Sequence, residues 1–284
     1  MIDISRDGSH VAYIADDPVG RRLYLKEMAE PARPVDGSEG AMSPAFSPDG
    51  RAVAYFADDE LRSVDVETGA SVVVAPAPNA ILGAAWTDDD RILFTTGYRS
   101  GLLSMELGSG QTVALTTVPR TQSDRLPVVV PGTTRLVYFS FVDPMGIWTV
   151  DASTGTQKPV VAGESPQYAD GHLFYRRGNT LYGQAFDTQA GAVTGAATPL
   201  VTGVSHYAIS ESGTLVYIPA RSTNTRLVLL EASGASRILT SGDTRIFGPA
   251  IAPDGRRVAI WFEGTLVLLE LRTGAEERIT NSIA

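Results

Sequence analysis

The chain has 284 residues, of which 19% are charged, and its 32 acidic and 23 basic side chains give a net charge of −9. This acidity argues against a nucleic-acid partner, because such a partner requires Lys and Arg patches that neutralise phosphate. The absence of cysteine excludes disulfides, thiolate metal sites and a cysteine nucleophile. A hydrophobic content of 43% is enough for an extensive core and argues against disorder.

A short motif recurs seven times along the chain, at intervals of about 41 residues. Its clearest copies are Ser43–Gly50 (SPAFSPDG) and Pro249–Gly255 (PAIAPDG). An apolar strand follows each copy, then a variable loop, a second apolar strand, a Gly turn and a last short strand. Four strands per repeat of this length are typical of a propeller blade, so the sequence predicts an all-β propeller.

Each repeat begins with a tight turn in which Pro suits a φ near −65°, Asp bonds its own backbone and Gly takes the left-handed position. The seven turns are Ser5–Gly8, Ser47–Gly50, Thr87–Asp90, Val130–Thr133, Tyr168–Gly171, Ser210–Gly213 and Ala252–Gly255. The strands expected after them are rich in β-branched and aromatic residues, which suits burial between two blades. These strands are Val11–Ala15, Val53–Ala57, Ile92–Thr96, Leu136–Ser140, Leu173–Arg177, Leu215–Pro219 and Val258–Phe262.

The third strands complete the pattern, and most of them lead into a Gly turn. They are expected at Leu23–Met28, Leu61–Val66, Leu102–Leu107, Gly146–Asp151, Thr180–Phe186, Arg226–Glu231 and Thr265–Leu271. No segment shows sustained helical periodicity with caps, so we expect almost no helix.

We interpret residues 1–284 as one seven-bladed β-propeller of four-stranded blades. The blades are expected at about 1–36, 41–76, 79–118, 124–162, 165–202, 204–241 and 246–281. The ring would close by packing of the seventh blade against the first. A six-bladed ring with irregular ends is the alternative, because the turn Val130–Thr133 departs from the motif.

The motif Ser43–Gly50 resembles the WD40-like (PD40) repeat of the TolB type. The longer stretch Arg21–Trp86 is similar to the propeller region on the C-terminal side of many bacterial transmembrane serine/threonine protein kinases. This resemblance covers nearly the whole chain, and it implies a sensor or interaction domain located outside the cytoplasm, in the periplasm or beyond. The kinase motifs themselves (the Gly-rich loop, the VAIK lysine, HRD and DFG) are missing, which excludes phosphoryl transfer by this chain.

The ends of the chain and its hydropathy bear on location. No stretch approaches about 20 apolar residues, so we expect no membrane insertion by this chain. Met1–Ile4 lacks the basic and apolar regions of a signal peptide. Because the chain starts inside the inner strand of the first blade, we expect it to be part of a longer protein.

The mouth of the central channel is the expected site, because loops from successive blades converge there. Two sets of loops should face it: the links into each inner strand and the loops between second and third strands. The first set supplies Glu39, Met42, Asn79, Asp124, Arg125, Glu164, His206 and Arg245. The second set supplies Asp16, Asp17, Arg21, Asp58, Asp59, Glu60, Tyr98, Arg99, Asp143, Arg176, Arg177, Arg221 and Glu263. The candidate ligand-binding residues are Asp124, Glu164, His206 and Arg245.

A metal at this mouth is an option that the residues leave open. His206 is placed where the chain enters an inner strand, and imidazole is the commonest metal ligand. With Asp124 and Glu164 it could complete an oxygen and nitrogen set for calcium or zinc. The alternative is a histidine that only bonds a neighbouring blade. The run Asp88–Asp90 lacks the other features of a calcium loop and is interpreted as a hairpin turn.

Two functions are consistent with these features. The first is a recognition module of the sensor type that binds a protein, a peptide or a small molecule on its loop face and requires no cofactor. The second is a metal-assisted hydrolase of esters, lactones or phosphotriesters with its site in the channel, which rests on analogy at the level of the fold. The motifs G-x-S-x-G, H-E-x-x-H and Walker A are all missing, and the sequence leaves open whether the chain is an enzyme.

Overall fold

A computed structural model describes residues 1–18, 20–119, 122–220, 225–230, 233–242, 246–262 and 265–279. The secondary structure of these residues consists of strands, as predicted, and they include no helix that could cross a membrane. The chain divides into two compact units, Met1–Ala220 and Arg221–Ala284. The two are described separately below as unit 1 and unit 2.

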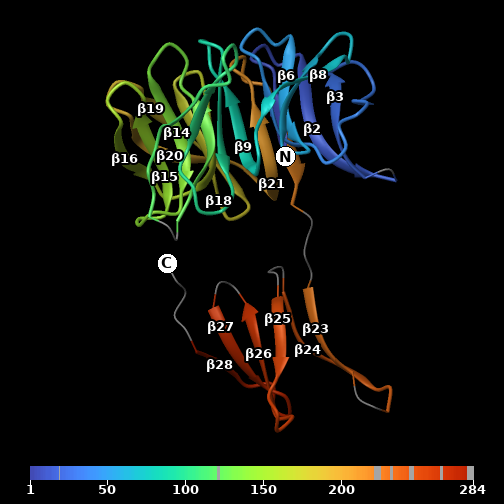
Figure 1. The fold of residues 1–284 in the computed structure, drawn as a ribbon. Coiled ribbons are helices and arrows are strands. Elements are labelled where there is room, and N and C mark those ends of the chain that lie inside the picture. The colour runs from blue at the N-terminus through green and yellow to red at the C-terminus, as the bar shows by residue number, and fades with distance from the viewer. Residues whose placement is uncertain are drawn as a thin grey trace. The chain divides into compact units, whose positions relative to one another are not determined.

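Unit 1 contains five four-stranded antiparallel sheets, each made of strands that are consecutive in the sequence (Figure 1). Their strands are β1 (Ile2–Ile4), β2 (His10–Asp17), β3 (Gly20–Glu27), β4 (Arg33–Pro34), β5 (Met42–Phe46), β6 (Ala52–Ala57), β7 (Glu60–Asp65), β8 (Ser71–Pro76), β9 (Ala80–Trp86), β10 (Arg91–Thr96), β11 (Leu103–Glu106), β12 (Thr112–Ala114), β13 (Asp124–Val129), β14 (Arg135–Ser140), β15 (Gly146–Asp151), β16 (Thr156–Val161), β17 (Glu164–Ala169), β18 (His172–Arg177), β19 (Thr180–Asp187) and β20 (Ala192–Thr202). A two-stranded sheet of β21 (Val204–Ile209) and β22 (Leu215–Pro219) follows. The second and third strands lie within a few residues of the predicted ranges.

Unit 2 contains a two-stranded sheet and a four-stranded sheet. Their strands are β23 (Thr225–Leu230), β24 (Ser236–Gly242), β25 (Ile246–Ile251), β26 (Arg257–Phe262), β27 (Thr265–Glu270) and β28 (Glu276–Arg278). The predicted sixth blade, 204–241, is therefore divided, with β21 and β22 in one sheet and β23 and β24 in another.

The inner strands of unit 1 form a closed circle. β1, β5, β9, β13, β17 and β21 contact one another in that order, and β21 contacts β1 again. Buried Ile4 and Val11 of the first blade pack against Ala208 of β21, where the sequence analysis expected the seventh blade. Six inner strands of unit 1 thus form the circle, and the number of blades in the chain stays a prediction.

The turns adopt the expected conformation. The N–H of Gly50 donates to the carbonyl of Ser47 at 2.9 Å, and the φ of Gly50 is 73°. Asp49 accepts from the Ser47 hydroxyl at 2.7 Å and from the N–H of Arg51 at 3.1 Å, as a residue that closes its own turn should. In the divergent third turn, Asp90 takes the glycine position with a φ of 56°. The run Asp88–Asp90 is thus a hairpin turn, as predicted.

The core consists of separate layers between adjacent blades. One layer joins Ala12 and Leu23 of the first blade to Val53 and Tyr55 of the second, and all four side chains are buried. Tyr138 and Tyr175 are fully buried at corresponding strand positions further along the chain. Each large apolar side chain buried in this way contributes about 1.5–3 kcal/mol, so the blades are stable mainly through their neighbours.

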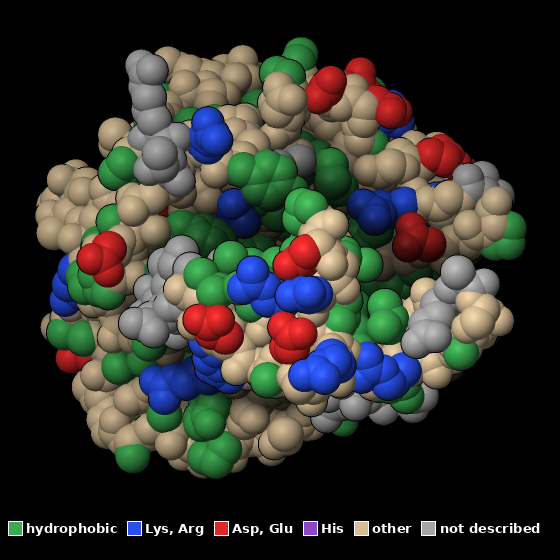
Figure 2. Space-filling model, turned by 90° about the horizontal axis from the view of Figure 1, so that it is seen from below, with side chains coloured by type: hydrophobic (Ala, Val, Ile, Leu, Met, Phe, Trp, Pro, Cys, Tyr) green, Lys and Arg blue, Asp and Glu red, His purple; other side chains and the backbone are tan. Residues whose placement is uncertain are grey.

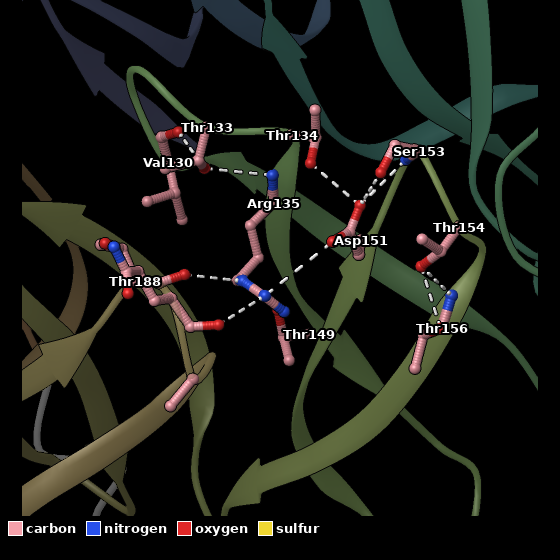
Figure 3. A network of polar contacts seen from close by, with 12 residues as sticks. Val130, Thr133, Thr134, Arg135, Thr149, Asp151, Ser153, Thr154, Thr156 and Thr188 are labelled. Carbon is pink, nitrogen blue, oxygen red and sulfur yellow. Dashed lines mark hydrogen bonds and ion pairs between the residues drawn. The ribbon is translucent and has the colours of Figure 1, made fainter.

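Arg135 makes the best-defined polar link between two blades (Figure 3). It begins β14, its Nε donates to the carbonyl of Thr188 and its Nη2 to the carbonyl of Gln189, each at 2.8 Å. Both carbonyls belong to the turn between β19 and β20 in the next blade. Asp151 lies 3.9 Å from the same guanidinium, and its other oxygen accepts from Thr134 at 2.9 Å. One arginine thus holds a strand of its own blade to a turn of the neighbouring blade.

We expect Arg135→Ala to lower the free energy of unfolding by about 1–2 kcal/mol, because two charge-assisted hydrogen bonds between blades are lost. The measurement is urea unfolding followed by tryptophan fluorescence. Arg91→Ala is the matched control. Arg91 begins β10 as Arg135 begins β14, but among the described residues its ion pairs are with Asp89 and Glu106 of its own blade. Arg91→Ala should lower the free energy of unfolding by no more than about 0.5 kcal/mol. An equal decrease in the two variants would contradict the role of Arg135.

Candidate functional site

A β-bulge interrupts five of the inner strands at the same place. At each bulge the ladder register shifts, and one residue has a φ between 51° and 64°. These residues are Ser43, Leu82, Leu126, Ser165 and Gly248. A bulge adds unpaired backbone to a strand and re-aims the neighbouring side chains. In unit 1 it therefore determines which side chains line the channel.

The residue after the bulge is proline in four of these strands, namely Pro44, Pro127, Pro166 and Pro249. Proline has no N–H, so this residue adds no unpaired donor at the bulge. β9 has Gly83 instead, whose N–H donates to the Ser43 hydroxyl of the preceding blade at 2.9 Å. A Cβ on Gly83 would lie 2.7 Å from the Cα of Leu126, so only glycine allows β9 and β13 to approach this closely.

The four bulges of unit 1, at Ser43, Leu82, Leu126 and Ser165, surround a cavity of about 270 Å³. It lies where the chain enters the inner strands, and we call this end of the channel the loop mouth. Its lining is largely apolar and includes Ile2, Leu82, Leu126, Pro166 and Tyr207, and Asp3, Gln167 and His206 are among its polar residues. An apolar hollow with a few polar groups is the usual form of a binding site.

The opposite end of the channel, which we call the turn mouth, has a smaller hollow of about 130 Å³. Arg6 lies here, and its guanidinium is 2.7 Å from Asp88 and 3.3 Å from Glu211. These ion pairs join turns of the first, third and sixth blades. The turn mouth is thus bridged by charged side chains, and the loop mouth offers the larger apolar hollow.

Asp3 and Gln167 are polar residues that line both hollows. The corresponding positions of β5 and β13 hold Ala45 and Val128. Oδ2 of Asp3 accepts from the N–H of Phe46 at 2.8 Å, which links β1 to β5. Burial raises the pKa of Asp3 to about 6, although hydrogen bonds from the N–H groups of Phe46 and Ile4 act to lower it. A carboxyl group that gains a proton near neutral pH therefore lines the channel.

We expect the stability of the protein to depend on pH through Asp3. Because the pKa is raised from 3.8 to about 6, the folded state binds the proton more tightly, so stability is lost as the pH rises through this range. Thermal unfolding is measured from pH 4 to 7. As the pH rises, the free energy of unfolding of Asp3→Asn should increase relative to that of the parent chain by up to about 3 kcal/mol.

The control for this experiment is Glu39→Gln, which alters an exposed carboxyl group away from the channel lining. It should leave the pH profile of the parent chain unchanged. Parallel profiles for the parent chain and Asp3→Asn would contradict a raised pKa.

The structure brings two of the predicted site residues to the same part of the loop mouth. His206 lines the cavity, and its Nδ1 is 2.8 Å from the Ser205 hydroxyl. Glu164 forms an ion pair with Arg176 at 2.9 Å, and Arg176 also donates to the carbonyl of Val204 at 2.8 Å. Partial burial lowers the pKa of His206, and the charges of the chain's amino group and Arg176 lower it further. His206 is therefore biased toward its neutral form.

Asp124 has a different position from the one expected. It is buried in β13 and does not line the cavity. Oδ2 accepts from the Thr116 hydroxyl at 2.5 Å, and Oδ1 accepts from the Ser140 hydroxyl at 2.6 Å. Burial raises its pKa, while these two bonds act to lower it. Its oxygens hold neighbouring segments together, which is a structural role. Arg245, the fourth candidate, lies outside the described residues.

The predicted metal set does not converge. Asp124 uses both oxygens on hydroxyl donors, and Glu164 pairs with Arg176. Across the ranges that the structure describes, no three His, Asp or Glu side chains form a group that could hold a metal ion. The residues present therefore do not fit the divalent cation considered from the sequence, and we derive no step that requires one.

Sequence reasoning missed Asp3, Leu82 and the bulges. Asp3 lies in a strand of three residues at the start of the chain, where no turn motif precedes it. The dipeptides Ser43-Pro44, Leu126-Pro127 and Ser165-Pro166 were the available signal, because proline inside a strand often marks a bulge.

No known protein family's sequence pattern matches this chain, and no curated protein matches it. Solved structures do match. TolB from Acinetobacter baumannii is 15% identical, with a TM-score of 0.59 over 96% of this chain and 63% of its own. The chain therefore spans less than two thirds of that protein. The propeller of Cps50 (Swd1) from Myceliophteria thermophila is 13% identical, with a TM-score of 0.50 over 98% of this chain and 84% of its own.

The chain has the TolB-like and WD40-like β-propeller fold. A prolyl endopeptidase is also similar, at 16% identity and a TM-score of 0.50, over 96% of this propeller and 46% of the endopeptidase. At these identities the similarity shows the fold alone. Figure 2 shows blue Lys and Arg side chains and red Asp and Glu side chains close to green hydrophobic ones in the view from below.

Proposed function

We propose that this propeller is a non-catalytic recognition module that binds a protein or peptide at the loop mouth of unit 1. The observation that carries the proposal is the apolar cavity of about 270 Å³ between the bulges. Pockets for drug-sized molecules have about 300–1,000 Å³. A slightly smaller hollow suits one or two side chains inserted by a larger partner, and His206 in its lining supplies a polar contact.

The resemblance to bacterial receptor kinases adds a context to this proposal. In that context the module would act as a sensor outside the cytoplasm, and a separate kinase region would carry out phosphoryl transfer. The chain itself contains none of the kinase motifs. The similar propeller structures support recognition only through the shared fold, in which loops from successive blades surround one opening.

The test compares Leu82→Asn with the parent chain. Leu82 lines the cavity with a φ of 64°, a conformation that asparagine adopts readily, so the change removes apolar lining with little backbone strain. Peptides selected from a display library against the parent chain should bind the variant about tenfold more weakly in fluorescence anisotropy titrations.

Val72→Asn is the control, because Val72 is 62% exposed on the outer strand β8, away from the cavity lining. It should bind the selected peptides as the parent chain does. Unchanged binding by Leu82→Asn would place the site elsewhere, and failure to select any peptide would contradict peptide recognition.

A second measurement separates recognition from hydrolysis. The parent chain and His206→Ala are assayed with chromogenic esters, lactones and phosphotriesters, with and without a chelator. Because no metal-holding group is formed by the described residues, we expect no turnover that the chelator or His206→Ala abolishes. Turnover with that dependence would establish the metal-assisted hydrolase instead.

A further inference from the structure

A second feature of the loop face is an arginine held between two aromatic rings. The guanidinium carbon of Arg125 lies 4.3 Å from the ring centre of Phe141 and 5.0 Å from that of Tyr98. Its Nε donates to the Ser123 hydroxyl at 2.8 Å. Arg125 makes no ion pair with an acidic side chain in the part of the chain that the structure describes.

The segments that carry these three side chains are tied together. The N–H of Asp124 donates to the carbonyl of Ser100 at 3.1 Å, which holds β13 to the loop of Tyr98. The N–H of Phe141 donates to the carbonyl of Ser123 at 3.0 Å, and the carboxylate of Asp124 accepts from Ser140 at 2.6 Å. Arg125 is therefore positioned in advance, and little side-chain freedom would be lost on binding.

The free end of the guanidinium determines what it can bind. The aromatic rings contact the guanidinium and the Ser123 hydroxyl accepts from Nε, so among the described residues Nη1 and Nη2 remain as donors. Two donors in one plane match the two oxygens of a carboxylate. Burial lowers the pKa of Arg125, and the side chain is half-buried, so a carboxylate here would be less screened than on an open surface.

The surroundings favour a peptide as the occupant. Tyr98 is 66% exposed and Phe141 37%, so exposed aromatic area lies beside the arginine. Aromatic residues, Met and Arg are the side chains enriched in protein interfaces. A small anion would leave this apolar area uncovered, whereas a peptide with an acidic residue beside an apolar one would cover it.

We infer that Arg125, with Tyr98 and Phe141, is the carboxylate-binding anchor for an acidic peptide segment of a protein partner. This inference rests on the proposed function, since it names the chemistry of the partner that the loop mouth recognises. Arg125 immediately precedes Leu126 of the cavity lining, so the two features are neighbours on β13.

The test uses blocked synthetic peptides in matched pairs, each pair with Glu or Gln next to Phe, Leu or Trp. In anisotropy titrations the parent chain should bind Glu peptides about tenfold more tightly than their Gln counterparts, because a carboxylate makes charge-assisted hydrogen bonds with the guanidinium. Arg125→Gln should abolish that difference. Arg125→Lys should keep only part of it, because lysine retains the charge without the planar pair of donors. Thermal unfolding midpoints confirm that each variant is folded.

Arg99→Gln is the matched control, since Arg99 is an exposed arginine next to Tyr98 and its replacement changes the net charge equally. It should keep the preference for Glu. The inference would be overturned if Arg99→Gln and Arg125→Gln lost the preference for Glu peptides equally, or if the parent chain showed no such preference. Inorganic phosphate that competes as well as the Glu peptides would also overturn it, in favour of a small-anion site.

The outcome for the proposed function can be distinguished in the same titrations. If peptides bind and Leu82→Asn weakens them while Arg125→Gln does not, the anchor is refuted and the recognition module stands. If no peptide binds the parent chain, both proposals are refuted.

Discussion

The bulge in the inner strands is the constraint on which the candidate site depends. In a regular strand alternate side chains face opposite sides, so a one-residue shift reverses every position that follows. The left-handed residue at Ser43, Leu82, Leu126 and Ser165 introduces this shift in successive blades. The side chains before and after it then face different environments, which creates the apolar cavity while the rest of each strand still packs between blades.

The acidic residues illustrate how position decides chemistry. Asp49 closes a turn, and hydrogen bonds from Ser47 and the N–H of Arg51 lower its pKa. Asp124 is buried, accepts hydrogen bonds from the hydroxyls of Thr116 and Ser140, and holds the segments around Arg125 together. Asp3 has one backbone donor from the next blade and a raised pKa, because burial outweighs that bond. The aspartate side chain therefore has three roles in this chain: Asp49 closes a turn, Asp124 links segments internally, and Asp3 lines the channel with a pKa of about 6.

Contacts between neighbouring blades account for most of the stability that the structure shows. Apolar side chains such as Leu23 and Tyr55 become buried only when two blades meet. Polar links such as Arg135 satisfy carbonyls of the adjacent turn. Since each blade depends on its neighbour, rigidity at the loop mouth comes from the ring of inner strands in unit 1, and this rigidity is what a preorganised site requires.

The sequence by itself determined the strands, the turns and the all-β class, because these follow from local patterns such as Ser47–Gly50 and Val53–Ala57. It also placed His206 and Arg125 where the chain enters an inner strand, and they lie in β21 and β13. Only the tertiary structure decided that Asp124 is an internal link, that Asp3 lines the channel and that β21 closes on β1. Those outcomes depend on the register at each bulge and on contacts between residues far apart in the sequence, such as Asp3 and Phe46. A local sequence pattern does not specify such contacts.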